Sequence, residues 1–249
     1  MGAERMVETQ TQAPLVLPAK KAEKTNEFFT SPVKKIYTEL QASIPSDLFV
    51  PEKFLRSMAR AIYEFEQANG KLPPAKLDGI KTAITEIANV VCGVKKNKEN
   101  SRSVFNKLAM IPDFFISYHA QLAGIVKATG SSDGATWAIT SLININDSRI
   151  LDDKNMPNMV KIAEAAKEST DRIFSLMANK GVRENFLKNP EGFVAKVEAI
   201  ASGLKDRAPD AFALLKVPDL IGANPDDKKA FEAFQKGADK FIAYYDSRQ

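Results

Sequence analysis

Apolar residues recur at intervals of three and four positions over most of the chain, which is the spacing of one face of an α-helix. The clearest example follows Pro73 and Pro74. Its apolar positions are Leu77, Ile80, Ile84, Ile87, Val91 and Val94. They form a narrow seam that suits packing against another helix at a shallow angle. The seam is too short for a free coiled coil, so we predict a buried helix within a bundle.

Prolines and glycines indicate where the other helices begin and end, because proline fits the first helical turn and glycine readily ends a helix. Together with the apolar spacing they predict about nine helices. The predicted ranges are 31–40, 51–69, 74–94, 103–109, 112–129, 157–180, 190–204, 209–217 and 225–245. No convincing pair of strands accompanies them. The sequence therefore predicts an all-α fold, an irregular multi-helix bundle.

Residues 130–156 fit two patterns. The alternating residues Trp137, Ile139, Ile143 and Ile145 are typical of a strand, whereas Ala138, Leu142 and Ile145 fit one face of a helix. A lone strand would have no partner, so the helix is favoured. We predict one helical domain over 28–249, with an alternative division into halves 28–129 and 157–249 joined by 130–156.

The first 27 residues show neither a helical nor a strand period. Their apolar island, Leu15-Val16-Leu17, lies between Pro14 and Pro18. We therefore predict a disordered N-terminal tail over 1–27. The island is interpreted as part of a linker, and a docking motif for a partner groove is the alternative.

Composition limits the metal sites and catalytic sites that the chain can form, because it has one histidine, His119, and one cysteine, Cys92. A zinc site needs three or four His, Cys or carboxylate ligands, and helical di-iron sites need two Glu-x-x-His elements. Nucleophilic catalysis commonly draws on the same two residue types. We therefore predict no cofactor, no metal site and no catalytic residues, and a protein that is not an enzyme. An enzyme that relies on carboxylate or backbone groups is the alternative. The acidic stripe Glu164, Glu168 and Asp171 is interpreted as a solvated face, with contact to a basic partner as the alternative.

Residues 130–134 read Gly-Ser-Ser-Asp-Gly and match the nucleophile-elbow pattern G-x-S-x-G. That elbow needs a strand before the serine and a histidine later in the chain. Here a helix is predicted before Ser132, and no histidine follows it. The stretch is more typical of a loop between helices.

The predicted compartment is the cytoplasm. One cysteine cannot form an intramolecular disulfide, and the first residues lack the apolar stretch of a signal peptide. No run approaches the ~18 apolar residues that span a bilayer. We therefore predict no transmembrane segment.

The best candidate for a functional surface is a basic cluster in a predicted loop. Its residues are Lys95, Lys96, Lys98, Arg102 and Lys107. These five cations and the single acid Glu99 give residues 95–107 a net charge of +4, which equals the net charge of the whole chain. An acidic protein surface, an anionic lipid headgroup and plain solvation are all compatible with such a cluster.

The function that we predict is a non-enzymatic helical protein–protein interaction module, an adaptor or structural subunit of a larger assembly. A subunit of a bacterial secretion complex is one example of such a module. This suggestion rests on how common such subunits are and not on particular residues. The alternative is a nucleic-acid-binding or nucleoprotein-like subunit that uses the basic loop 95–107. Phe105, Phe114 and Phe115 follow this loop and would supply base stacking, but they fall on inward faces of predicted helices.

Overall fold

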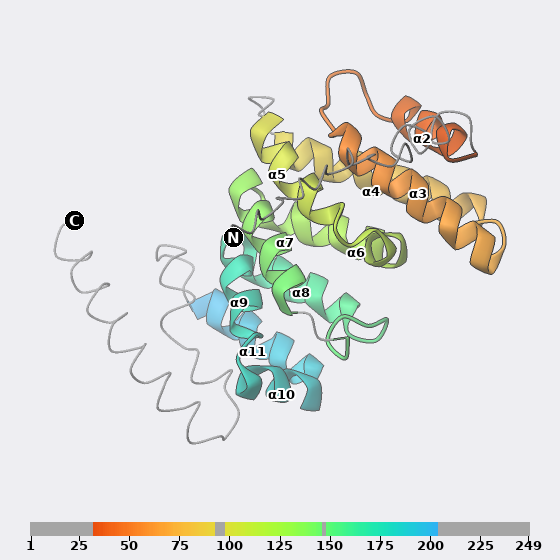
Figure 1. Ribbon diagram of the computed structural model, residues 1–249. Helices are drawn as coiled ribbons and strands as arrows, with labels where there is room; N and C mark the ends of the chain where they lie inside the picture. The colour runs from red at the N-terminus through yellow and green to blue at the C-terminus, as the bar shows by residue number, and fades with distance from the viewer. Residues whose placement is uncertain (1–31, 93–97, 146–147, 204–249) are drawn as a thin grey trace, which may run out of the picture.

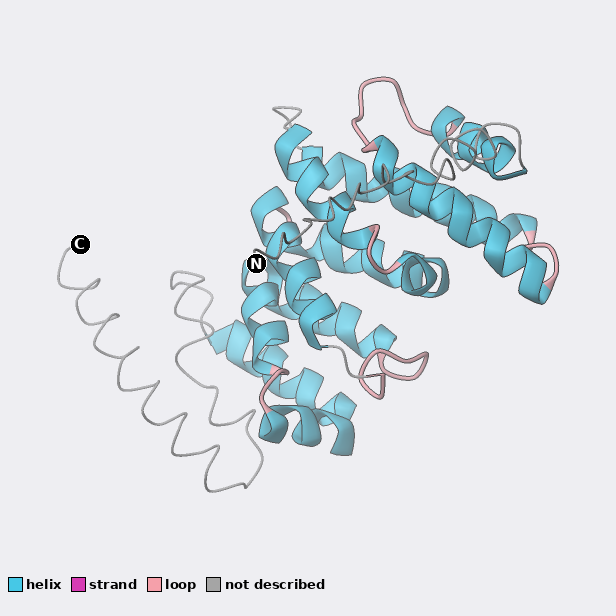
Figure 2. Ribbon diagram, in the orientation of Figure 1, coloured by secondary structure: helices cyan, strands magenta, loops and turns pink. Residues whose placement is uncertain are grey.

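The computed structural model describes residues 32–92, 98–145 and 148–203, and every regular element in these ranges is a helix (Figure 1). The elements are α2 (Pro32–Ala42), α3 (Glu52–Asn69), α4 (Pro74–Cys92), α5 (Lys98–Leu108), α6 (Pro112–Thr129), α7 (Ser132–Ile145), α8 (Met156–Ala166), η1 (Lys167–Ser169), α9 (Thr170–Leu176), α10 (Lys180–Lys188) and α11 (Pro190–Gly203). Figure 2 shows short loops between them and no strand in the described part. The predicted all-α multi-helix fold is confirmed. The predicted tail 1–27 and the predicted helices 209–217 and 225–245 lie outside the described residues.

The seam of α4 is buried, as its spacing predicts. Ile80, Ile84, Ile87 and Val91 have no exposed surface, and Leu77 is partly buried against the core. Helix α4 packs mainly on α6 and also contacts α5 and α7. Val94, the last predicted member of the seam, lies outside the described residues.

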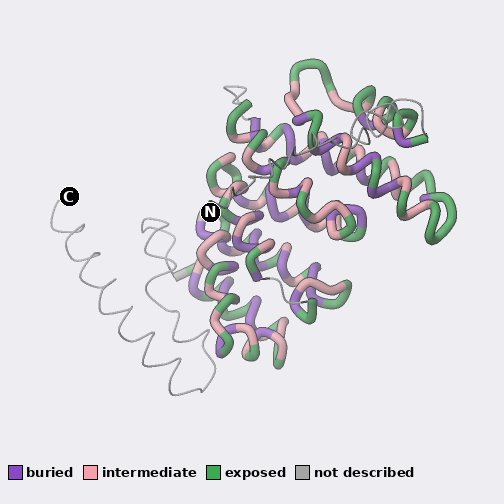
Figure 3. Tube along the Cα trace, in the orientation of Figure 1, coloured by how far each residue is buried: buried purple, intermediate pink, exposed green. Residues whose placement is uncertain are grey.

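The helices form one continuous stack of contacts. Helix α2 packs on α3, α4 on α6, α6 on α8, and α8 on α11. In Figure 1, α2 lies at one end of the molecule beside α3, and α10 and α11 lie at the other end. The buried apolar residues from Val33 to Ile200 belong to a single cluster, and Figure 3 shows buried positions recurring between exposed ones along the helices.

The stretch 130–156 contains helix α7, in agreement with the favoured helical interpretation. Its buried residues are Ala135, Ala138, Ile139, Ser141, Leu142 and Ile145. They recur at intervals of three and four, whereas Trp137, which a strand would bury beside Ile139, is 61% exposed. Turns occupy most of the described residues between α7 and α8.

The predicted continuous helix over 157–180 is wrong. The chain breaks after α8, where Lys167 adopts a positive φ of 49°, and continues through η1 into α9. The hydroxyl of Thr170 lies within hydrogen-bonding distance of the carbonyl oxygens of Ala163 and Lys167, which helps to satisfy the backbone at the break. The apolar spacing hides the break because Ala166, Ile173 and Met177 are buried on both sides of it. The proposed acidic stripe is therefore not carried by one continuous helix.

Helix α10 is a further element that the apolar spacing did not indicate. Its signal in the sequence is Asn179, whose side-chain oxygen accepts hydrogen bonds from the backbone N–H groups of Gly181 (2.9 Å) and Val182 (3.3 Å). Asparagine is a preferred N-cap residue for this reason. Among the helices that the structure describes, none combines the length and the apolar character needed to cross a bilayer.

Candidate functional site

The basic cluster lies largely on a helix and not in a loop. Helix α5 begins at Lys98, five residues before the predicted start at Ser103, and includes Arg102 and Lys107. Lys95 and Lys96 lie outside the described residues. For the described part, the prediction of a basic loop over 95–107 is therefore corrected to a basic helix.

The structure brings Lys98 and Arg102 together and places Lys107 apart. At about 100° per residue, Arg102 is turned only about 40° from Lys98 around the helix axis, whereas Lys107 is on the opposite side. Lys107 also lies about 14 Å further along the axis. Lys98 and Arg102 are exposed, and Lys107 is half-buried.

The inward face of α5 explains why these cations point outward. Ser101, Val104, Phe105 and Leu108 are fully buried, at the spacing of one helical face. The ring of Phe105 packs against Phe54 of α3 with 4.8 Å between the ring centroids. This contact fixes α5 on the bundle and leaves the face with Lys98 and Arg102 to the solvent.

Both cations lie over the aromatic ring of Phe49, in the segment between α2 and α3. Lys98 Nζ is 5.6 Å from the ring centroid, and Arg102 Cζ is 5.4 Å from it. These distances are within the range of cation–π attraction, which is worth about 0.5–1 kcal/mol at exposed sites. Phe49 therefore holds two cations close together that would otherwise repel each other.

The backbone of Phe49 is held by two other helices. Its carbonyl oxygen accepts a hydrogen bond from the Ser101 hydroxyl and a longer contact, 3.6 Å, from the Cys92 thiol. Ser101 is fully buried and Cys92 nearly so. Sequence analysis missed Phe49 because 52 residues separate it from Ser101, and no local pattern joins them.

A shallow pocket of about 280 Å³ lies next to Phe49, between α2 and the start of α3. Its lining residues are Tyr37, Gln41, Ile44, Pro45, Ser46, Leu48, Phe49, Val50, Glu52 and Leu55. Glu52 is the one ionisable carboxylate among them, and it pairs with Arg56 one turn later on α3. Burial raises the pKa of Tyr37, and the negative charge of Glu52 raises it further.

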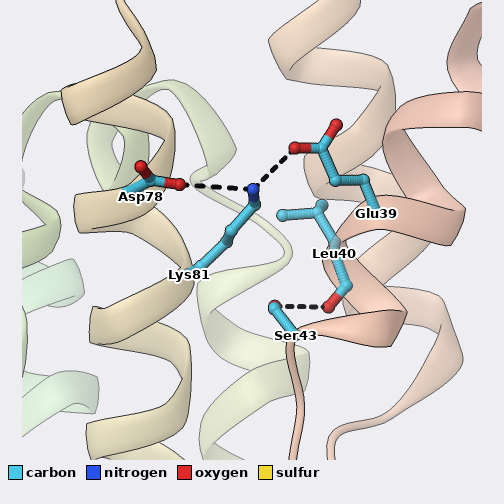
Figure 4. A network of polar contacts seen from close by, with 5 residues as sticks. All are labelled: Glu39, Leu40, Ser43, Asp78 and Lys81. Atoms are coloured by element: carbon cyan, nitrogen blue, oxygen red, sulfur yellow. Dashed lines mark hydrogen bonds and ion pairs between the residues drawn. The ribbon is translucent and has the colours of Figure 1, made fainter.

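Ion pairs fix α2, which forms one wall of this pocket. Lys81 of α4 reaches Glu39 of α2 at 2.6 Å and Asp78 of its own helix at 3.4 Å (Figure 4). The hydrogen bond to Glu39 raises the pKa of Lys81. At the end of α2, the Ser43 hydroxyl donates to the Leu40 carbonyl at 2.7 Å, where the chain leaves the helix toward the pocket.

The electrostatics at the start of α5 do not favour a cation there. The N-terminal end of a helix carries the positive end of its dipole, so an exposed cation in the first turn costs roughly 0.3–1 kcal/mol. Lys98 is the first residue of α5. Glu99 partly offsets this charge, although its carboxylate lies 3.7 Å from Arg102 and both side chains are largely exposed.

Cys92 and His119 do not form a thiol–imidazole pair. The Nδ1 atom of His119 donates to the Ile116 carbonyl at 3.1 Å, since that oxygen can only accept. The Nε2 atom packs against Gly79, where an added Cβ would lie 2.6 Å away. Cys92 is thirteen residues further along α4, or about 20 Å along its axis. Burial lowers the pKa of His119, and the nearby charge of Lys76 lowers it further.

The G-x-S-x-G stretch joins two helices. Gly130 ends α6 in the left-handed conformation (φ 64°), and Ser132 begins α7. The Ser132 hydroxyl accepts a hydrogen bond from the Asn100 side-chain amide at 2.8 Å. No strand enters this turn, so its geometry differs from that of a nucleophile elbow.

Within residues 32–92, 98–145 and 148–203, no three His, Cys, Asp or Glu side chains are arranged to hold a metal ion. The start of α5 combines two exposed cations and a half-buried aromatic ring, which also lines a shallow pocket of mixed polar and apolar character. Comparison of the chain with protein-family models, with curated proteins and with solved structures found no match.

Proposed function

We propose that this protein is a non-enzymatic interaction module whose basic surface binds an acidic region of a protein partner. The basic surface is defined as Lys98 and Arg102 on Phe49. The supporting observation is the pair of exposed cations held on one aromatic ring at a helix N-terminus. The helix dipole disfavours a cation at Lys98 by about 0.3–1 kcal/mol, which offsets most of what its contact with Phe49 contributes.

A carboxylate of a partner would lower the energy of this arrangement. It would neutralise the repulsion between neighbouring cations and oppose the positive end of the helix dipole. The arginine can in addition bind a carboxylate through two parallel hydrogen bonds. Several such exposed contacts contribute mainly to the association rate and to the choice of partner.

Nucleic acid is the second candidate, and the positions of the phenylalanines count against it. Phe105 and Phe115 are fully buried in the core. Phe114 is half-buried and packs against Tyr118, with 4.8 Å between the ring centroids. A single strand would therefore find charge on this surface but not the stacking platform that the sequence suggested.

The test is charge reversal with a matched control. Lys95, Lys96, Lys98 and Arg102 are all replaced by Glu in one variant. In the control, the exposed lysines Lys154, Lys161, Lys180 and Lys188 are replaced by Glu. Both variants change the net charge equally.

Each variant is crosslinked to its partners in nuclease-treated extract and compared with the original chain. We expect the control to retain a protein partner that the first variant loses, and we expect added salt to release the partner from the original chain. A partner that both variants retain would contradict the proposal. In a separate assay, salt-dependent binding of a 20-nucleotide single strand that only the first variant loses would favour the nucleic-acid alternative.

A further inference from the structure

We infer that the basic surface and the neighbouring pocket form one docking site for a short acidic segment of a partner that carries an apolar anchor residue. This inference rests on the proposed function and specifies its partner. Phe49 links the two parts, because it lines the pocket and also lies under Lys98 and Arg102. A single segment that contacts both parts needs only a few residues, since four extended residues span about 13 Å.

The pocket provides the apolar half of the site. Ile44, Leu48 and Val50 are half-buried and Leu55 is buried, so aliphatic side chains line part of the pocket beside polar ones such as Gln41. A volume of about 280 Å³ accommodates one large aliphatic or aromatic side chain. Apolar anchors in pockets of this kind commonly dominate the affinity of a protein contact.

The cations provide the acidic preference. Lys98 and Arg102 are exposed and lie over the ring of Phe49, which also lines the pocket. Glu52, on the pocket wall, is already paired with Arg56, and Glu99 lies near Arg102. A basic segment would meet Lys98 and Arg102 directly and be repelled, whereas carboxylates on either side of the anchor would be attracted.

The pocket is also a stable feature of the bundle. One of its walls, α2, is tied to α4 by the Lys81–Glu39 ion pair, and Lys81 is only 18% exposed. Its other wall begins α3, which packs through Phe54 against Phe105 and Phe115. The segment between α2 and α3, which supplies most of the lining, is held by the hydrogen bond from Ser101 to the Phe49 carbonyl. These contacts limit the ordering that docking would require.

The test uses a displayed library of random 12-residue peptides selected on the full chain. Enriched peptides are synthesised with a fluorescent label, and their affinity is measured by anisotropy. We expect the enriched sequences to place two or more Asp or Glu residues within a few positions of a Leu, Ile, Met or Phe. Alanine in place of that apolar residue should weaken binding about tenfold or more.

Two protein variants separate the halves of the site. Leu48→Gln should weaken peptide binding about tenfold while leaving its salt dependence unchanged. Lys98→Glu combined with Arg102→Glu should weaken binding by at least as much and flatten the salt dependence. The control variant with Lys154 and Lys161 replaced by Glu should bind like the original chain. Ile44→Gln replaces Leu48→Gln if the latter lowers the melting temperature.

The outcomes distinguish this inference from the proposed function. If acidic peptides bind without an apolar residue, and bind the Leu48→Gln variant as tightly as the original chain, the result would contradict the role of the pocket but not the proposed acidic partner. Selection of basic or uncharged peptides would contradict both the docking inference and the proposed function. Binding that is unchanged in the charge-reversal variant would also contradict both. Failure to enrich any sequence would also overturn both.

Discussion

His119 and Lys98 are both polar residues on helices, but His119 is packed between two helices and Lys98 is exposed. His119 lies between α6 and α4, with one ring nitrogen bonded to the Ile116 carbonyl and the other against Gly79. Lys98 is exposed, lies over the half-buried ring of Phe49 and is the first residue of α5, where the helix dipole disfavours a cation. Packing explains the first residue, whereas the second remains exposed and contacts the Phe49 ring. The proposed function accounts for this difference by giving Lys98 a role in binding.

The buried contact between α4 and α6 should contribute strongly to the stability. Ile84 lies in the seam of α4 and has no exposed surface. We expect Ile84→Ala to lower the free energy of unfolding by about 2–5 kcal/mol, because it removes buried methyl groups and leaves a cavity. Urea unfolding measures this change. The exposed neighbour Thr82 serves as control, and Thr82→Ala should change stability by less than about 0.5 kcal/mol. A loss below about 1 kcal/mol for Ile84→Ala would mean that the seam is not a core.

The close approach of His119 to α4 depends on the missing side chain of Gly79. An added methyl group would lie 2.6 Å from Nε2, so the ring would have to move away from its bond to Ile116. We expect Gly79→Ala to destabilise the protein by about 1 kcal/mol, since overpacking and the lost hydrogen bond outweigh the gain in helix propensity. Urea unfolding of the single variant measures this loss.

The matched control is the same substitution in a His119→Ala background. With the ring removed, Gly79→Ala should become stabilising by up to about 1 kcal/mol, because alanine is the better helix former. The reversal of sign is a double-mutant cycle that isolates the contact. Equal effects in both backgrounds would show that His119 and Gly79 do not interact.

His119 also makes the stability of the protein depend on pH. Burial lowers its pKa in the folded state from the ordinary value near 6.5, so the unfolded chain binds the proton more readily. The stabilisation is therefore complete above pH 6.5 and is lost as the pH falls from 6.5 toward the lower folded pKa. Unfolding measured between pH 7.5 and pH 5 should show a decrease that His119→Gln reduces. Identical pH profiles for the two proteins would show that His119 is freely solvated.

The helices were predictable from the sequence where a single face is buried. Proline and glycine marked the ends of α6, and the α4 seam lies in the core as its spacing indicates. The break at Lys167 was not predictable, because Ala166 and Ile173 keep a helical spacing across it. Backbone geometry at one residue leaves no trace in a pattern of apolar positions.

The candidate site was predictable only in part. Lys98 and Arg102 could be selected because charge is concentrated around them, but Phe49 could not. Its role arises from the packing of α5 beside the segment that precedes α3, a contact between positions far apart in the sequence. Lys107 illustrates the converse, since it is near the others in sequence but lies on the opposite side of α5.

The smallest change in stability should come from Lys98→Glu, which tests the exposed half of the comparison directly. The substitution removes a cation–π contact worth about 0.5–1 kcal/mol. It also places a negative charge at the first position of α5, which the helix dipole favours by about 0.3–1 kcal/mol. A carboxylate four residues before Arg102 adds a helical ion pair of about 0.2–0.5 kcal/mol. Removing the disfavoured cation adds a further gain of about 0.3–1 kcal/mol. The gains therefore match or exceed the loss, so we expect urea unfolding to show a stability that is unchanged or raised by up to about 1 kcal/mol.

Lys98→Met is the matched variant, because it removes the charge and keeps an unbranched side chain of similar length. It should lose the cation–π contact without gaining the ion pair, and should therefore be slightly less stable than Lys98→Glu. Partner binding should follow the opposite order, with Lys98→Glu weaker than Lys98→Met, because the reversed charge repels an acidic segment. A loss of more than about 1.5 kcal/mol in either variant would place Lys98 with His119 among the residues that hold the fold. The argument for a binding role at the start of α5 would then fail.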